Sequence, residues 1–100
     1  MRETIRDLNI RRRTDVSMVT IARKLNPILR GWMGYYGRYT PSALTPIYRY
    51  VNQTLRAWVM RKFKRFKRHG TRASKFLERI ARQQTGLFVH WRGGLGDAFA

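Results

Sequence analysis

Side chains suited to acid–base or metal chemistry are few in this sequence and lie far apart. The acidic residues are Glu3, Asp7, Asp15, Glu78 and Asp97. General acid–base catalysis and two-metal nucleotidyl transfer both need carboxylates gathered in one pocket. The chain has no Cys, His69 is surrounded by arginines and lysines, and His90 has no acid or histidine near it in sequence to share a metal ion. The sequence therefore predicts neither an enzyme active site nor a metal or cofactor site.

Positive charge interleaved with aromatic rings is the chemistry that the sequence does offer. The 22 Lys and Arg residues give a net charge of +17, and no carboxylate occurs from residue 16 to residue 77. Internal ion pairs cannot neutralise such a stretch, which favours an anionic partner. The densest segment is 56–68, where basic residues alternate with Trp58, Phe63 and Phe66. Cations neutralise phosphates and aromatic faces stack on unpaired bases, so this composition is typical of nucleic-acid binding.

The basic residues that we expect to contact a nucleic acid lie mainly in this segment. They are Arg30, Arg49, Arg56, Arg61, Lys62, Lys64, Arg65, Lys67 and Arg68. A solvated helix face is the alternative interpretation of any one cluster, although solvated helices usually mix both signs of charge. Helical spacing places Trp58 in the core and leaves Phe63 more open to stacking on a base. The aromatic residues between 32 and 39 are expected in the core, with one of the three tyrosines facing outward.

The elements that must position these side chains are predicted to be helices. Residues 2–8 form a short helix, and residues 11–13 form a basic linker. Ser17 is a good N-cap for a helix that runs to about residue 25, and Pro27 then either begins a second helix or kinks the first. Apolar residues at spacings of three and four continue to residue 39. Gly31 and Gly34 interrupt this helical pattern, which suggests close approach of another backbone or of RNA.

Two further amphipathic helices are predicted, over about 43–67 and 72–84, with Ser42 and Thr71 as caps. The stripe of the first consists of Leu44, Ile47, Tyr48, Val51, Leu55, Trp58, Val59 and Phe66. Residues 88–91 are expected to be extended. The fold class is therefore all-α: a small three-helix bundle with a short N-terminal helix and a loose C-terminal tail. We divide the chain into a basic lead-in over 1–15, a helical domain over 16–92 and a flexible tail over 93–100.

Residues 25–36, LNPILRGWMGYY, resemble the signature of the group II intron maturase-specific domain, or domain X. The motif residues are Leu25, Asn26, Pro27, Arg30, Gly31, Trp32, Tyr35 and Tyr36. The resemblance spans about residues 5–92. It implies a thumb-like helical domain of a reverse transcriptase that binds group II intron RNA and assists its folding and splicing. Polymerase aspartates and an endonuclease domain do not accompany the motif here, so we expect no reverse transcription by this chain alone.

Group II intron RNA is thus the expected partner, and several alternatives stay open. The charge pattern fits a generic basic helical module for DNA or other duplexes equally well. DNA, an RNA–DNA duplex and a separate reverse transcriptase polypeptide are further partners to test. An amphipathic protein at a membrane surface is a third interpretation. The longest apolar run is four residues and the N-terminus lacks a secretory pattern, so we expect a cytoplasmic protein without membrane association.

Overall fold

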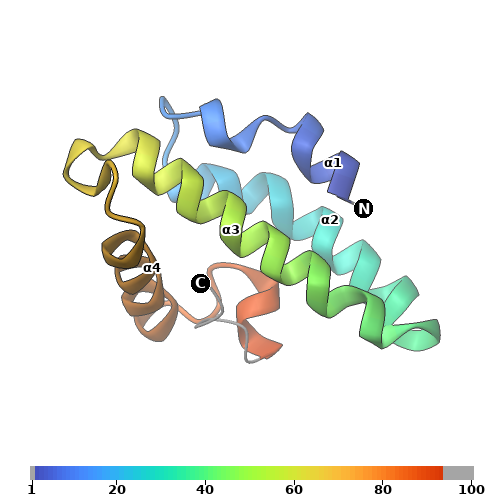
Figure 1. Ribbon diagram of the computed structural model, residues 1–100. Coiled ribbons are helices and arrows are strands. Elements are labelled where there is room, and N and C mark those ends of the chain that lie inside the picture. The colour runs from blue at the N-terminus through green and yellow to red at the C-terminus, as the bar shows by residue number, and fades with distance from the viewer. Residues whose placement is uncertain (1, 94–100) are drawn as a thin grey trace.

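The chain folds into helices joined by short turns, and the computed structural model describes residues 2–93 (Figure 1). The α-helices are α1 (Arg2–Asp7), α2 (Met18–Tyr39), α3 (Leu44–Lys62) and α4 (Gly70–Gln83). The 3-10 helices are η1 (Ile10–Arg12), η2 (Pro41–Ala43), η3 (Lys64–Phe66) and η4 (Val89–Gly93). The described residues contain no strand, so the predicted all-α class is confirmed. The predicted tail over 93–100 lies almost entirely outside the described residues.

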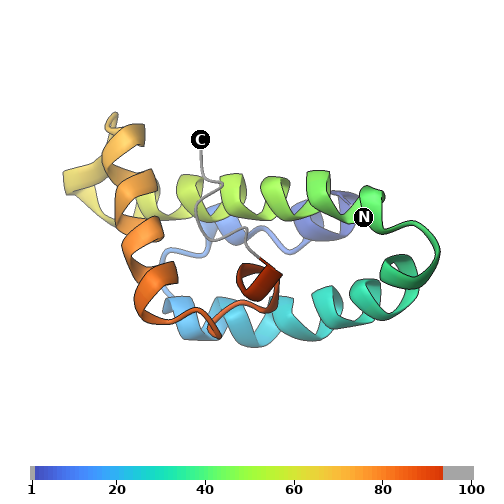
Figure 2. The same cartoon turned by 90° about the horizontal axis from the view of Figure 1, so that it is seen from below.

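The longest elements, α2 and α3, run antiparallel as a hairpin, and α4 crosses the end of that hairpin (Figure 2). Ser17 is the N-cap of α2, as predicted, and its hydroxyl accepts a hydrogen bond of 3.3 Å from the backbone nitrogen of Thr20. No second helix begins at Pro27, because α2 continues through it. Leu25 and Leu29, on either side of the proline, are both fully buried. Their packing compensates for the backbone hydrogen bond that proline cannot make.

Helix α3 supplies the centre of the core. It packs against α1, η1, α2, η2, η3 and α4. All eight residues of its predicted apolar stripe are buried, including Trp58, which confirms the assignment of Trp58 to the core. Burial of each large apolar side chain stabilises the fold by roughly 1.5–3 kcal/mol, so this one face organises most of the packing.

The ends of α3 and α4 differ from the prediction. Helix α3 ends at Lys62 rather than near residue 67, because Phe63 adopts an extended backbone and η3 follows it. This turn returns Phe66 to the core, where it is buried. Ala43 rather than Ser42 occupies the N-cap position of α3, and His69 rather than Thr71 occupies that of α4, in neither case with a side-chain cap bond.

The N-terminal segment packs along α3 on the side away from α4 (Figure 1). Residues 11–13 are not a linker, since residues 10–12 form η1 and Ile10 is buried together with Ile5 of α1. The indole nitrogen Nε1 of Trp58 donates a 2.7 Å hydrogen bond to the backbone oxygen of Arg13. The core of α3 therefore anchors this basic segment.

The prediction that residues 88–91 are extended is wrong. Residues 89–93 form η4, which lies between α2 and α3, and the side chains of residues 88–91 are all buried (Figure 2). Asn26 of α2 holds this segment: its Nδ2 donates to the backbone oxygen of Leu87 at 3.0 Å, and its Oδ1 accepts from the backbone nitrogen of Val89 at 3.1 Å. The alternation of apolar residues was misleading because both sides of the segment face protein.

Candidate nucleic-acid interface

The basic segment 56–68 does not present all its charges in the same way. Arg56 is half-buried, and its Nε donates a 3.1 Å hydrogen bond to the backbone oxygen of Gly70. Lys62 is half-buried too: its Nζ donates to the backbone oxygens of Thr14, at 3.2 Å, and Val16, and lies 5.1 Å from the Trp58 ring centroid. These two cations therefore already have partners within the fold.

The other predicted cations of the segment are exposed. They are Arg61, Lys64, Arg65, Lys67 and Arg68. All five lie at the C-terminal end of α3 or in the turn that leads to α4. Arg30 of α2 and Arg49 of α3 are exposed as well, but they belong to other stretches of the surface.

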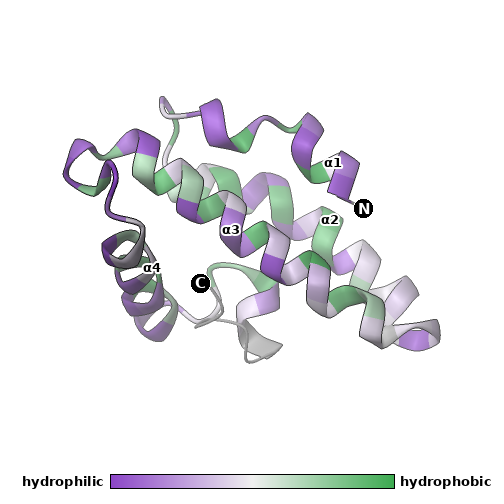
Figure 3. Ribbon diagram, viewed as in Figure 1, coloured by the Kyte–Doolittle hydropathy of each residue, from purple (hydrophilic) through white to green (hydrophobic). Residues whose placement is uncertain are grey.

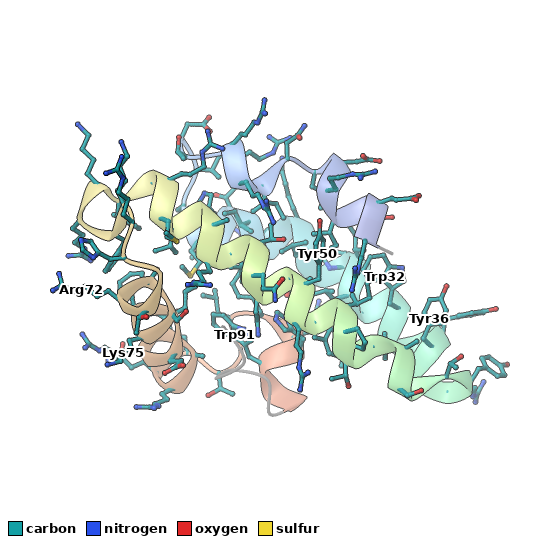
Figure 4. All side chains as sticks on the ribbon, in the orientation of Figure 1. Trp32, Tyr36, Tyr50, Arg72, Lys75 and Trp91 are labelled. Carbon is teal, nitrogen blue, oxygen red and sulfur yellow. The ribbon has the colours of Figure 1, made fainter. Side chains whose placement is uncertain are left out.

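Helix α4 adds a basic stripe that the sequence analysis missed. Its exposed cations are Arg72, Lys75, Arg79 and Arg82. Spacings of three and four residues place them on one side of the helix, opposite the buried Ala73 and Leu77. Figure 3 shows the outside of α4 and the preceding turn as hydrophilic, and Figure 4 shows Arg72 and Lys75 pointing away from α3. The same helical spacing that identified the apolar stripe of α4 could have revealed this one.

We call a set of exposed cations from this turn and from α4 the α3–α4 surface. It comprises Lys64, Arg65, Lys67, Arg68, Arg72, Lys75 and Arg79. Arg65 and three cations of α4 line a hollow of about 340 Å³ with Phe66 and Phe76. Glu78 does not line this hollow, although helical spacing places it beside Lys75, three residues earlier on α4.

Arg61 belongs to a second basic region, which lies on the other side of α3. It lines a hollow of about 320 Å³ with Arg6 of α1 and with Arg11 and Arg12 of η1. These N-terminal arginines were not among the predicted contact residues. The run 61–68, continuous in sequence, thus contributes to two different surfaces.

The motif residues of α2 divide between packing and exposure. Leu25 is in the core, Asn26 binds the segment before η4, and Trp32 and Tyr36 pack against the core while partly exposed. Pro27 and the glycines are exposed, and a Cβ atom added at Gly31 or Gly34 would meet nothing within 4 Å. Close approach of another part of the described chain therefore does not explain these glycines.

The tyrosines of α2 are more exposed than predicted. Tyr35 is 62% exposed and Tyr39 is 69% exposed, so two of the three face outward rather than one. The ring of Tyr35 packs edge-on against Tyr36, with centroids 4.9 Å apart, and lies 5.5 Å from Tyr39. Tyr35 and Tyr39 lie near the C-terminal end of α2, where this helix and α3 extend beyond α4 and η4 (Figure 2).

Phe63 is not free for a base as expected. Its ring packs at steep angles against Trp58, Phe66 and Phe76, with centroids 5.9–6.4 Å apart. The reason is the turn after Lys62, which places Phe63 between α3 and α4. The aromatic residues of the basic segment therefore form a packed group beneath the charges.

A buried cluster of polar side chains connects α3 with η4. Asn52 Oδ1 accepts hydrogen bonds from His90 Nε2 at 2.7 Å and from Trp91 Nε1 at 3.1 Å. Because an amide oxygen only accepts, His90 carries its proton on Nε2. Burial lowers the pKa of His90 to about 3 and raises that of the nearby Tyr48 hydroxyl. Among residues 2–93, no three His, Asp or Glu side chains gather where they could hold a metal ion.

Within residues 2–93, no helix combines the length and the apolar character needed to cross a bilayer. The apolar faces of α2, α3 and α4 pack against one another instead.

The chain was compared with protein families, curated proteins and solved structures. The model of the group II intron maturase-specific domain matches residues 1–77, which include the α2 motif, the α3–α4 turn and most of α4. No curated protein and no solved structure matched the chain. The maturase-specific domain is a non-catalytic domain with a role in group II intron splicing. On this match, which covers most of its length, the chain belongs to the family of the group II intron maturase-specific domain.

Proposed function

We propose that this chain binds group II intron RNA through the α3–α4 surface and so assists the folding and splicing of the intron. The observation that carries the proposal is the clustering of exposed cations on this surface. The sequence from residue 16 to residue 93 contains a single acidic residue, Glu78, to balance them. Family membership supplies the class of RNA. The RNA contacts predicted for Arg30, Arg49 and Arg61, which lie outside the α3–α4 surface, also belong to the proposal. Arg56 and Lys62, whose side chains donate hydrogen bonds to backbone oxygens, are proposed to act by holding the fold.

The physical basis is the release of counterions. Folding a large RNA brings phosphate backbones together, and each cation that contacts a phosphate displaces a condensed counterion and reduces the repulsion. The α3–α4 surface rests on a packed aromatic group, so its cations start from fixed backbone positions. A surface of this kind stabilises compact RNA without performing chemistry on it.

A salt titration of binding to intron RNA tests the proposal. The variant K64Q/K67Q/R68Q removes three charges from the surface, and R23Q/K24Q/R38Q removes three exposed charges from α2 as a matched control. The first variant should lower affinity and reduce the slope of log affinity against log salt by about two to three, since each contact contributes roughly 0.7–0.9. The control should change the slope by less than about one unit. Equal losses in the two variants would contradict a localised surface.

Two further measurements define the partner. Intron RNA should compete better than unrelated duplex DNA or an RNA–DNA duplex, and equal competition would support a generic duplex-binding module instead. Splicing of the intron at reduced Mg²⁺ should be faster with the protein than without it. Repeating that assay with a separate reverse transcriptase polypeptide shows whether the two chains act together.

A further inference from the structure

The hollow between η3 and α4 contains a cation that lies against aromatic rings. The guanidinium carbon of Arg65 is 4.7 Å from the ring centroid of Phe66, 5.5 Å from that of Phe76 and 5.6 Å from that of Phe63. Arg65 is nevertheless exposed, as are the neighbouring Arg72, Lys75 and Arg79.

We infer that this hollow is a binding site for an unpaired nucleotide. The base stacks on the Arg65 guanidinium and the exposed part of Phe76, and the phosphates on either side of it are neutralised by Arg72, Lys75 and Arg79. The inference rests on the proposed RNA binding and makes it specific, since it assigns this part of the surface to single-stranded rather than duplex RNA.

The arrangement of α4 supports the assignment. Residues 72, 75 and 79 follow one another at spacings of three and four, and Phe76 borders this stripe on the side of η3. Phe76 is half-buried, and Phe66 beneath it is buried, with ring centroids 5.1 Å apart. The packing of Phe66 and Phe76 holds these rings in place, and Figure 4 shows Arg72 and Lys75 on the outer side of α4.

A duplex would make poor use of this site. Its bases are already stacked on one another, so it needs only charges at the spacing of its phosphates. Proteins that bind single strands combine cations along the backbone with Arg planes or aromatic rings on which unpaired bases stack. The hollow has both components, since Arg65 and Phe76 line it together with Arg72, Lys75 and Arg79.

The freedom of Arg65 is the second argument. Its guanidinium carbon lies 4.7–5.6 Å from three ring centroids, whereas Arg56 and Lys62 donate hydrogen bonds to backbone oxygens. The guanidinium of Arg65 is exposed, so it offers a planar group for stacking and N–H donors for a phosphate oxygen. Arg65 is thus placed to contact both parts of one nucleotide.

The experiment compares a single-stranded RNA decamer carrying one 2-aminopurine with a blunt RNA duplex of the same length. The protein is the full chain. Stacking should quench the 2-aminopurine fluorescence when the wild-type protein binds. Arg65→Lys keeps the charge and removes the planar group, so it should lower affinity for the single strand roughly five- to tenfold, abolish the quenching and leave duplex affinity within about twofold. Arg82→Lys, on α4 outside the hollow, is the matched control and should change neither.

A second variant replaces the aromatic ring of the site with an aliphatic side chain. Phe76→Leu should also abolish the quenching, and circular dichroism and a melting curve show that it is folded. Quenching that persists in both variants, or equal losses for single strand and duplex in Arg65→Lys, would overturn the inference. Binding to duplex and single strand alike, with no quenching in the wild type, would overturn it too while leaving the proposed RNA binding intact. Failure to bind either RNA would overturn both proposals.

Discussion

Arg68 adopts a left-handed backbone conformation, with φ of 65°, in the turn of the α3–α4 surface. For a residue with a Cβ atom this conformation costs roughly 1–2 kcal/mol, and glycine would adopt it freely. The position therefore keeps a positive charge at the expense of local stability. Strained residues often cluster at functional sites, so the strain is in line with the proposed role of Arg68 in RNA binding.

Arg68→Gly should raise the free energy of unfolding by up to about 1 kcal/mol while lowering affinity for intron RNA. The gain comes from relief of the left-handed strain, reduced by the larger entropy of glycine in the unfolded chain. Urea unfolding and filter binding measure the two effects. Asn9→Gly is the control, because Asn9 has φ of 53° but asparagine tolerates this conformation. Lower stability in Arg68→Gly would contradict the strain argument.

His90 makes the stability of the fold sensitive to acid. Its pKa is about 3 in the folded protein and 6.5 in an unfolded chain. Between these pH values the histidine is protonated in the unfolded state and neutral in the native state. The free energy of unfolding therefore falls as the pH drops below 6.5, by up to about 1.4 kcal/mol per pH unit, and this loss ends near pH 3.

Between pH 7 and pH 5, this histidine should cost the wild type about 2 kcal/mol of stability. His90→Gln should remove that loss, because glutamine can still donate to Asn52 but does not titrate. Urea unfolding at the two pH values gives the difference, with the exposed His69→Gln as control. If the glutamine variant does not fold, NMR titration of the His90 ring in the wild type should show it neutral at pH 5. A ring protonated at that pH would contradict the assignment.

Lys62 is a cation for which a structural role and an RNA-binding role predict opposite results. Its hydrogen bonds to the backbone oxygens of Thr14 and Val16 hold the segment before α2 on the end of α3. Lys62→Gln should therefore lower the free energy of unfolding by roughly 1–2 kcal/mol and change RNA affinity little. Lys64 is exposed and lies two residues away. Lys64→Gln should therefore lower RNA affinity and leave the free energy of unfolding nearly unchanged. Unfolding and binding curves for both proteins decide which description of Lys62 is correct.

At the scale of elements, α2 contains a destabilising feature that its own packing does not require. Gly31 and Gly34 lie inside the helix, where each costs roughly 1 kcal/mol relative to alanine, and neither would bring an added Cβ atom within 4 Å of another group. The exposed Arg30 and Arg38 lie on the same helix close to them.

Gly31→Ala and Gly34→Ala should each stabilise the protein by up to about 1 kcal/mol. Thermal melting measures the gain, and RNA binding measured in parallel shows whether the bare backbone serves a contact. Gly70→Ala is the contrasting variant: its Cβ atom would overlap the Arg56 guanidinium and disturb the bond from Arg56 to residue 70. It should be destabilising, and a gain in stability at Gly70 would show that Arg56 moves without cost.

At the scale of the whole molecule, the net charge of +17 opposes folding. Like charges on a small domain repel one another, and salt screens that repulsion by shortening the Debye length from about 10 Å at 0.1 M to about 3 Å at 1 M. Raising NaCl over this range should therefore raise the melting temperature by several degrees, at roughly 4–8 °C per kcal/mol. The variant K64Q/K67Q/R68Q carries less charge and should gain less. An equal gain in both proteins would attribute the effect to general salting rather than to repulsion on this surface.

Much of the fold could be predicted because helix periodicity is local. Apolar residues at spacings of three and four identified the face of α3 that Val51 and Leu55 share, and both are fully buried. The boundaries were less accurate, since α3 ends where Phe63 and Phe66 turn back to the core, and this depends on packing with α4. The segment around His90 was misjudged for the same reason: its partners are Asn26 and Asn52, far away in the sequence.

The sequence by itself determined the all-α class, the absence of carboxylates from residue 16 to residue 77 and the family motif, because composition and short-range spacing are properties of the chain alone. Only the tertiary structure decided which cations face solvent. Contacts between distant segments secured Arg56 and Lys62, directed Arg61 toward α1 and η1, and brought Arg65 beside α4. The partners of a side chain depend on which helices pack together. The spacing of residues within one helix does not determine that packing.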